Sequence, residues 1–495
     1  RQSVVHHFNS EASFNKSAIL TSFTFSKFGN ILMGKNRQHG FQNWGLVNEY
    51  SSNSSSLYFE SPSKNNNPNI QKNSEYSQID ILQKIVFTLP KEKQLLINLQ
   101  FSNSSNIPRF DKLNEMIKNN LRFAEWKYGP QKRLFISPQL KIFPNKKYLY
   151  KGTIIAAYQW VKESRIQRRF ESVDRINQNE NVNIFSLNAD FEAPKTRKVS
   201  IVYGFEFIGN KIKSDAFRER LILLGNTITQ TQFLGKFPSR YPNNGSSYFV
   251  SAAYSNMRLD LNSKSSISLG ARYTSTKIKA SWANEQFLKS KNLDLKTTNN
   301  ALTGSISSSY RPNKNVKMNF LFSTGFRSPN IDDLGKIREN RGVLIIPNPE
   351  LKPEYVYNFE GGLTFSKDDA FSIEGRFFNS NIKNYIGRII SPFSNNLSNS
   401  GISSLIIDNE KLSTQINQNI GNARIYGVSI DGMGKFFNCF SIMGNINLTN
   451  STVNKQIGPL PSILPLYGNV RINYNRQKFN LTLRNNFSGR KLPED

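Results

Sequence analysis

Cysteine, histidine and long apolar runs are all scarce in this sequence of 495 residues. The single cysteine, Cys439, has no partner in the chain for a disulfide, so the redox compartment stays open. No stretch approaches the roughly 18 consecutive apolar residues that a membrane-spanning helix needs, which excludes a helical membrane protein. A hydrophobic share of 37% and a mean hydropathy of −0.50 still allow a β-barrel, because only alternate residues of each strand face lipid.

The signatures of catalysis are also missing. The sequence contains no Gly-x-Ser-x-Gly elbow, no phosphate-binding loop and no His-Glu-x-x-His site. His6 and His7 are adjacent on an expected strand, so they point to opposite faces and are poor metal co-ligands. Asp332 and Asp333 form a carboxylate pair among basic residues, which indicates a solvated, charge-paired loop. We therefore expect no enzyme, no cofactor and no metal site.

The ends of the chain carry no targeting signal. The sequence opens at Arg1 without an initiator methionine or a signal peptide, and Asp495 closely follows the last expected strand. We interpret residues 1–495 as one domain that is incomplete at both ends, so the missing signal says nothing about location. The Ser/Asn-rich run 51–69 is typical of a flexible loop tip rather than of a linker.

The formal net charge is +30 at pH 7. One interpretation is an anionic partner such as nucleic acid, lipopolysaccharide or an acidic ligand. The other is a bias toward Lys and Asn in turns and loops, as at Lys146 and Lys147. Because no basic helix and no aromatic-basic RNA motif accompanies the charge, we favour the second interpretation and expect no nucleic acid.

Apolar and polar residues alternate with period two in segments of about ten residues, which predicts half-buried β-strands. The segment 95–102 places four apolar residues on one face, namely Leu95, Ile97, Leu99 and Phe101. Segments 266–274, 316–326, 355–365 and 479–487 repeat the pattern. A soluble sandwich would also alternate, so the strands alone do not decide the fold.

The connections between these strands do decide it. We count about eighteen strands, and their links alternate strictly between short and long. Short links lie near residues 15, 91, 145, 196, 263, 313, 367, 437 and 476, and long links span roughly 30–75, 103–130, 163–181, 211–245, 276–299, 327–354, 381–422 and 450–465. Short turns on one rim and long loops on the other predict an all-β, antiparallel transmembrane barrel. If the complete chain begins and ends on the short-turn side, an odd number of strands precedes residue 1 and an odd number follows residue 495. One before and three after would give 22, the size of plugged outer-membrane transporters.

Two short motifs occur within the link 327–354 and its flanks. Residues 325–335 read Gly-Phe-Arg-Ser-Pro-Asn-Ile-Asp-Asp-Leu-Gly, and residues 347–354 read Pro-Asn-Pro-Glu-Leu-Lys-Pro-Glu. The pair resembles the FRAP and NPNL boxes of TonB-dependent receptors, with Ser in place of the usual Ala. The box residues are Phe326, Arg327, Ser328, Pro329, Asn348, Pro349, Glu350 and Leu351. Both boxes either shape the base of the loop, through prolines that end and restart strands, or contact a ligand.

Two further stretches, 38–45 and 104–111 together with 122–130, and the strand at 427–431 also resemble this family. The resemblance covers roughly residues 3–490, the barrel only, and includes no plug domain. It implies an outer-membrane receptor of a Gram-negative bacterium, surrounded by lipid and lipopolysaccharide. In such receptors the ligand binds between extracellular loops and a plug, and the periplasmic protein TonB couples the plug to an inner-membrane motor.

Ligand-binding candidates lie on the expected long loops, because iron chelates and corrinoids are large, partly flat and often anionic. We select the aromatic, basic and imidazole side chains there: His39, Trp44, Arg109, Trp126, Tyr128 and Arg327. Packing of the loops into a compact cap is the alternative role for each of them. For His39, a place on the loop surface is favoured over iron or haem ligation.

The leading hypothesis is energised uptake of a bulky, scarce nutrient, with an iron chelate (a siderophore) as the expected ligand. The alternatives are a cobalamin or haem receptor, a passive pore, and a scaffold barrel in an outer-membrane complex. Haem receptors that resemble this family carry a histidine between the two boxes. Residues 330–347 contain no histidine, cysteine, methionine or tyrosine, so the usual axial ligand of haem iron is missing.

Overall fold

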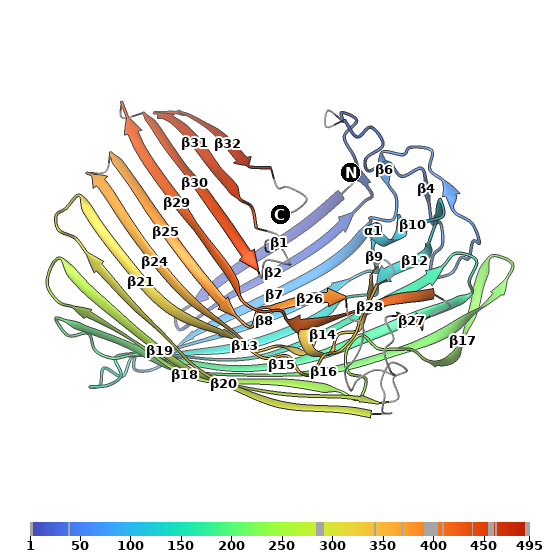
Figure 1. Ribbon diagram of the computed structural model, residues 1–495, viewed down its shortest axis with the longest axis horizontal. Coiled ribbons are helices and arrows are strands. Elements are labelled where there is room, and N and C mark those ends of the chain that lie inside the picture. The colour runs from blue at the N-terminus through green and yellow to red at the C-terminus, as the bar shows by residue number, and fades with distance from the viewer. Residues whose placement is uncertain are drawn as a thin grey trace.

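The computed structural model describes residues 3–37, 40–283, 292–340, 343–368, 370–390, 404–407, 410–437, 439–453, 460 and 463–490. One antiparallel sheet of 21 strands makes up most of this part and curls round on itself (Figure 1). In the described part of the chain, no helix has both the length and the apolar character to cross a membrane.

Eighteen long strands follow one another around the sheet in chain order. The other three of the 21 lie within connections: β9 (Ile107–Pro108), β12 (Phe123–Tyr128) and β17 (Thr227–Lys236). The long strands are β1 (Ser3–Phe14), β2 (Ser17–Phe28), β7 (Tyr76–Thr88), β8 (Gln94–Ser104), β13 (Lys132–Ile142), β14 (Lys151–Arg169), β15 (Asp174–Glu192), β16 (Val199–Leu224), β18 (Ser246–Asp260), β19 (Ser265–Ala283), β20 (Asn292–Tyr310), β21 (Val316–Arg327), β24 (Glu354–Lys367), β25 (Phe371–Lys383), β29 (Ala423–Phe436), β30 (Phe440–Val453), β31 (Leu466–Arg476) and β32 (Phe479–Ser488). Each pairs antiparallel with the next, so the predicted eighteen strands and their order are confirmed.

The connections sort onto two rims, as the sequence predicts. Phe14 pairs with Ser17, and Arg476 pairs with Phe479, so both of these hairpins close with two residues. Left-handed backbone conformations occur in such turns, with φ of 51° at Phe437. We call this end the short-turn rim and the opposite end the long-loop rim.

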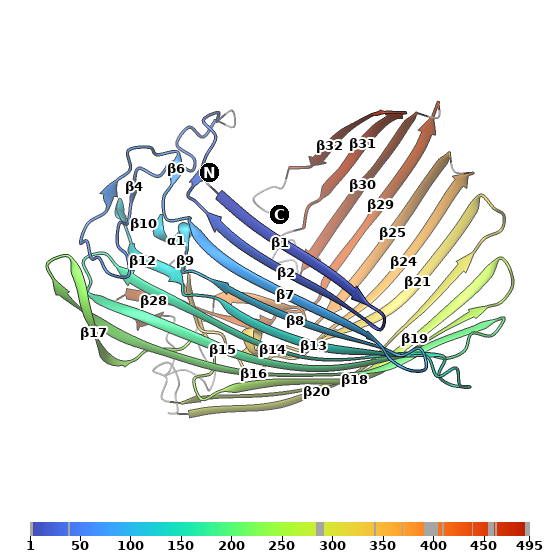
Figure 2. The ribbon, with the colours of Figure 1, turned by 180° about the vertical axis from the view of Figure 1, so that it is seen from behind.

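Several of the expected long loops are instead extensions of the strands. β14 and β15 stay paired as far as Gln167 and Ile176, so the predicted loop 163–181 shrinks to a tight turn. β16 runs on to Leu224 and forms with β17 a hairpin that projects past its neighbours (Figure 2). The extensions of β14 and β15 carry polar residues on both faces, so backbone pairing continues there where the hydrophobic alternation stops. The sequence pattern could not reveal them for that reason.

Large apolar side chains occupy one face of the sheet. Phe320 and Phe322 of β21 are 51% and 45% exposed, and the same alternation recurs on the neighbouring strands. Polar side chains occupy the other face and bond across strands, as where Ser102 Oγ donates to Asp80 Oδ1 at 2.7 Å. An apolar outer face and a polar inner face are what a barrel in lipid requires.

β1 and β32 form the two edges of the sheet. Every residue of both strands is exposed. Within the described residues, β1 pairs only with β2 and β32 only with β31, and Figure 1 shows the two strands on either side of a gap. The expected total of 22 strands stays a prediction.

Small elements fill the long-loop rim. They are β3 (Ile31–Leu32) with β6 (Ile70–Gln71), β4 (Glu49–Tyr50) with β5 (Ser63–Lys64), α1 (Phe110–Leu113), β10 (Met116–Ile117) with β11 (Asn120–Leu121), α2 (Ile331–Gly335), and a sheet of β22 (Arg338–Asn340), β23 (Val343–Ile345), β26 (Ile386–Ile390), β27 (Ser404–Ile407) and β28 (Glu410–Asn419). The largest apolar core lies here, around Trp282, Ile278 and Leu334, of which 1% or less is exposed. The connections therefore form a packed layer at the long-loop rim.

Candidate ligand-binding site

A cavity of about 110 Å³ lies within this layer at the long-loop rim. Its walls come from α1, β12, the adjoining ends of β14 and β15, the connection after β17, and the segment that follows α2. Seven arginines and one lysine line it, against a single carboxylate, that of Asp174. The site is therefore strongly cationic.

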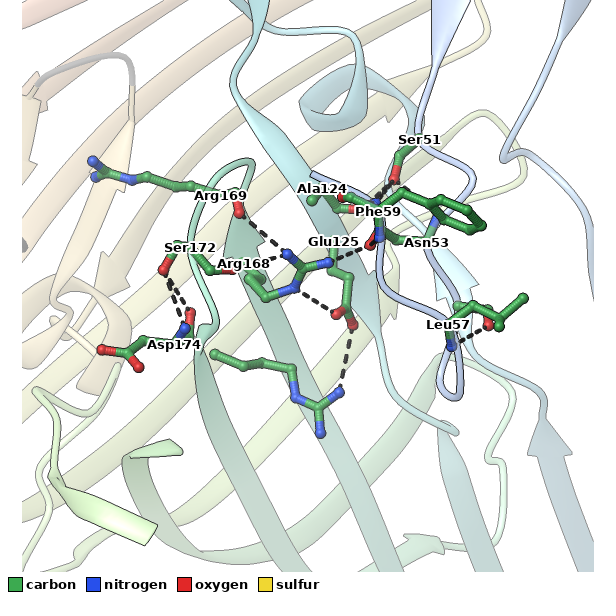
Figure 3. A network of polar contacts seen from close by, with 12 residues as sticks. Ser51, Asn53, Leu57, Phe59, Ala124, Glu125, Arg168, Arg169, Ser172 and Asp174 are labelled. Carbon is green, nitrogen blue, oxygen red and sulfur yellow. Dashed lines mark hydrogen bonds and ion pairs between the residues drawn. The ribbon is translucent and has the colours of Figure 1, made fainter. Parts of the chain in front are cut away.

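Arg168 forms the buried centre of one wall (Figure 3). Its side chain is 0% exposed, and its Nε donates to Glu125 Oε1 at 2.9 Å. A β-bulge in β12 places Glu125 directly across from Arg168 on β14. The remaining guanidinium nitrogens donate to Asn53 Oδ1 and to the backbone oxygen of Ser172. One arginine thus joins β12, the turn between β14 and β15, and the loop around Asn53.

Glu125 is held in its charged form by the cations around it. Burial alone would raise the pKa of Glu125, but Lys127, Arg168 and Arg175 outweigh that effect and hold the pKa below its usual value. The Lys127 Nζ and Glu125 Oε2 atoms lie 2.9 Å apart. This carboxylate is therefore committed to protein partners.

Most other cations of the lining also have carboxylate partners in the chain. Arg109 donates to both carboxylate oxygens of Asp111, and Lys112 and Arg122 share Glu115. Arg165 pairs with Glu163 and, at 2.6 Å, with Glu180. These pairs fix the positions of the guanidinium groups.

Arg240 and Arg338 differ from the rest of the lining. Within the described part of the chain, neither forms an ion pair with a carboxylate. The Nε of Arg240 is buried and has no hydrogen-bond partner there. Burial lowers the pKa of Arg338, and the neighbouring charges of Arg240 and Arg109 lower it further. Tyr241, Glu180 and Asp332 lie near enough to Arg240 to raise its pKa, but no carboxylate in the described ranges contacts Arg240 or Arg338 directly.

Aromatic rings form part of the same site. The Arg109 guanidinium carbon lies 4.8 Å from the centre of the Trp126 ring, a cation–π contact. Tyr128 meets Trp126 edge-on, with ring centroids 5.5 Å apart. Arg109 and Trp126 line the cavity itself. The structure therefore brings together three of the residues that the sequence singled out.

The other predicted ligand-binding residues lie elsewhere. Trp44 is 64% exposed on a separate loop, where its backbone oxygen accepts a hydrogen bond from Arg37 Nε. Neither Trp44 nor Arg327 lines the cavity. His39 lies outside the described residues. The six predicted residues thus do not form one cluster.

The box residues hold the base of their loop. Arg327 donates to both Asp333 and Glu354 at 2.6 Å, and Ser328 is buried beside Pro329. In the second box, Asn348 Nδ2 donates to the backbone oxygen of Asn417 at 2.7 Å, and Asn348 Oδ1 accepts from Glu350 N. The remaining box residues pack close by, with Phe326 against Tyr355, Leu351 buried, and Pro349 in the same segment. These contacts support the interpretation that the boxes shape the loop.

The predicted charge-paired loop at Asp332 and Asp333 is present. Lys336 Nζ lies 2.6 Å from Asp332 Oδ2, and Tyr241 donates to Asp332 Oδ1 at 2.8 Å. Asp333 instead completes a capping box with Asn330 at the start of α2. No group of three potential metal ligands is clustered anywhere in the described ranges.

Sequence reasoning missed Arg168, Glu125, Arg240 and Arg338. One signal was present, because residues 165–169 carry three arginines within a segment expected to be a long link. No pattern in the sequence indicates that Arg240 and Arg338, almost a hundred residues apart, line the same cavity.

Comparison with known proteins gives a family match over most of the chain. Residues 33–492 match the family described as TonB dependent receptor-like, beta-barrel. No match was found among curated proteins.

Solved structures with a similar fold include the copper transporter OprC, with a TM-score of 0.65 and 10% identity over 96% of this chain and 64% of that one. A double mutant of the Serratia marcescens hemophore receptor HasR, in complex with its hemophore HasA and heme, gives 0.66 and 12% over 98% and 72%. The ferric yersiniabactin uptake receptor FyuA of Yersinia pestis gives 0.61 and 12% over 97% and 66%. The chain thus spans about two thirds of the length of these proteins, and the likeness is one of fold.

Proposed function

The chain belongs to the family of TonB-dependent receptor-like β-barrels, and from this we propose that it forms the barrel of an outer-membrane receptor for an anionic iron chelate. The family consists of receptors and transporters of the Gram-negative outer membrane, not of enzymes. The chain itself adds a rim on which cationic and aromatic side chains gather.

That rim is the observation that carries the proposal. In outer-membrane barrels the long loops face the cell exterior, so the long-loop rim is the side a nutrient meets first. Arginine pairs with oxygen anions and stacks on flat ligands, and a chelate of iron offers both features. Arg109, which stacks on the buried Trp126, is one of the cations that give this rim its charge. An uncharged or cationic nutrient would gain nothing from this rim.

Energised uptake would require further partners. We propose a plug inside the barrel that is coupled to TonB in the periplasm, with lipid and lipopolysaccharide around the apolar outer face. Phe320 and its neighbours on that face provide the hydrocarbon-facing band. Without coupling, the same barrel would act as a passive pore or as a scaffold.

Haem is the weaker ligand candidate for a chemical reason. Between the two boxes, residues 330–347 contain no histidine, cysteine, methionine or tyrosine that would serve as an axial ligand of haem iron. His39 is the remaining loop imidazole. Cobalamin carries a phosphodiester but no net negative charge, so the cationic rim favours it less than an anionic chelate.

The test is a set of titrations of the complete, plug-containing receptor with ferric chelates, haem and cobalamin, together with iron uptake in cells with and without TonB. We expect tight chelate binding, TonB-dependent uptake and no response to haem. Sub-micromolar haem binding that is lost in His39→Ala would contradict the chelate proposal. Uptake that persists without TonB would instead establish a passive pore.

A further inference from the structure

Three arginines from three separate connections line one cavity. Arg109 precedes α1, Arg240 follows β17, and Arg338 begins β22. Arg109 and Arg240 are both close enough to Arg338 for their charges to disfavour its charged form. The fold therefore holds like charges together, although the segments that carry them are far apart in the sequence.

Such an arrangement is unfavourable without a counter-ion. Removing cations from water is costly unless each is paired, and most of the other arginines here are paired, as Arg168 is with Glu125. Arg109 has one partner, Asp111, whose side chain is 64% exposed. Arg240 and Arg338 have no carboxylate partner in the described ranges, and the buried Nε of Arg240 lacks an acceptor there. Glu180 and Asp332 stabilise the charge of Arg240 only from a distance, so both guanidinium groups can still contact an anionic ligand directly.

Size and charge narrow the class of that ligand. A volume of about 110 Å³ is similar to that of a protein cavity of roughly 150 Å³ that admits benzene, a ligand of six heavy atoms. A complete iron chelate is far larger, whereas a tetrahedral oxyanion of five heavy atoms fits. A carboxylate brings one negative charge, while a phosphate brings nearly two and several strong acceptor oxygens. Guanidinium forks bind such oxygens in pairs.

The walls strengthen the preference for a well-defined anion. Ile176, Phe237 and Ile337 contribute apolar surface to the cavity. Apolar walls lower the local dielectric, so each charge-assisted hydrogen bond is stronger there than at an open surface. The carboxylates near the cavity already pair with other arginines. Few acceptors of the protein therefore compete with an anion for Arg240 and Arg338.

We propose that this cavity binds a tetrahedral oxyanion with a charge near minus two, of the phosphate type, through Arg109, Arg240 and Arg338. The source of the oxyanion is either free phosphate or a phosphate group on lipopolysaccharide next to the rim. This site goes beyond the proposed uptake of an iron chelate and does not depend on it.

The experiment is isothermal titration of the complete receptor in detergent with inorganic phosphate, sulfate, citrate or chloride at constant ionic strength. We expect saturable binding of phosphate and sulfate but not of chloride. Phosphate binding should strengthen as the pH rises through the second dissociation of inorganic phosphate, because the dianion carries the charge that the arginines favour, whereas sulfate binding should not change over the same range. A second arm uses vesicles that contain lipid A with or without its phosphate groups, which separates the two sources.

Arg240→Gln and Arg338→Gln should each weaken phosphate binding about tenfold or more, the usual effect of losing a hydrogen bond between charged groups. Arg258→Gln is the matched control, because Arg258 pairs with Asp260 near the short-turn rim. Heat-modifiable mobility on gels reports whether each variant is folded. If a variant is not folded, phosphate binding is measured with Arg338→Lys in its place. Phosphate binding no better than that of chloride, binding of citrate alone, or an equal loss in Arg258→Gln would overturn the proposal. None of these results depends on chelate uptake, so the two proposals fail separately.

Discussion

Arg327, the last residue of β21, and Glu354, the first residue of β24, face each other in register, and 2.6 Å separates Nη1 of one from Oε2 of the other. Arg327 closes the loop that carries both boxes, and it also pairs with Asp333 at 2.6 Å. A guanidinium engaged by two carboxylates has little capacity left for a ligand. The pair therefore acts as a clasp at the base of the loop.

Breaking this clasp should loosen the loop to a degree that depends on which partner is removed. Glu354 also accepts a hydrogen bond from Ile386 N, so Glu354→Ala should cost roughly 1–3 kcal/mol of local stability. Arg327 is about half exposed, and Arg327→Ala should cost about 1 kcal/mol or less. Hydrogen exchange across residues 328–340 measures both values. A larger loss in Arg327→Ala than in Glu354→Ala would contradict the clasp.

The buried pair of Arg168 and Glu125 should be more sensitive. Glu125→Ala leaves an arginine with a fully buried side chain without its carboxylate, and we expect a loss of roughly 3–5 kcal/mol in the stability of the surrounding loops. Asp215→Ala is the control, because Asp215 and Lys236 form an exposed pair whose loss should cost about 1 kcal/mol or less. Proteolysis between residues 51 and 59 reports the loosening, and equal sensitivity of both variants would argue against a buried pair.

Lowering the pH should destabilise the loops around Glu125 by protonating the same carboxylate. Because the pKa of folded Glu125 lies below the unfolded value of about 4.3, its contribution is complete above that pH and is lost as the pH falls through the folded pKa. The pKa of Glu180 is raised by burial, so Glu180 acts in the opposite direction. Comparison of the wild type with Glu125→Gln isolates the contribution of Glu125. The difference in hydrogen exchange of the loops between the wild type and Glu125→Gln should shrink below about pH 4. A difference that stays constant with pH would exclude a role for the Glu125 charge.

The two rims should label differently on intact cells. In a background without Cys439, cysteines at Asn66 or Asn244 should react with an impermeant maleimide, because both residues lie at the long-loop rim. Cysteines at Lys146 or Asn313, in short turns, should react only after the outer membrane is opened. A third exterior position, Asn396, lies outside the described residues. The reverse labelling pattern would show that the long-loop rim faces the periplasm.

The two faces of β21 should tolerate charge differently. Phe320 is 51% exposed on the apolar face, so Phe320→Arg should cost roughly 2–4 kcal/mol if it lies near the bilayer midplane. Asn319 is its neighbour on the polar face, and Asn319→Arg should be much milder. Folding into lipid vesicles, followed by urea titration, measures the difference. Equal costs would mean that the assignment of the faces is wrong.

The barrel strands were predictable because their signal is local and repeated. Alternation in 316–326 or 479–487 reports lipid on one side and water on the other, and each short turn separates two such segments. β17 and the ends of β14 and β15 were missed, because strand pairing outside the lipid needs no apolar face. The backbone hydrogen bonds that extend these ribbons leave no trace in hydropathy.

The site was predictable only in part. Arg109, Trp126 and Tyr128 lie within 20 residues of one another, so a loop motif was enough to select them. Arg240 and Arg338 reach the cavity through contacts between distant connections, which no local pattern encodes. Charge pairing is equally non-local, since the partner of Glu125 lies 43 residues further along the chain.

The exposed backbones of β1 and β32 carry a consequence for handling the protein. A strand whose N–H and C=O groups face outward acts as a template for any extended segment that meets it. The apolar residues of β32, Leu481 and Leu483 among them, are 57% and 65% exposed and would favour such additions. Residues 1–495 prepared alone should therefore form edge-to-edge oligomers, and a short soluble peptide that copies an edge strand should act as a chain terminator of that assembly.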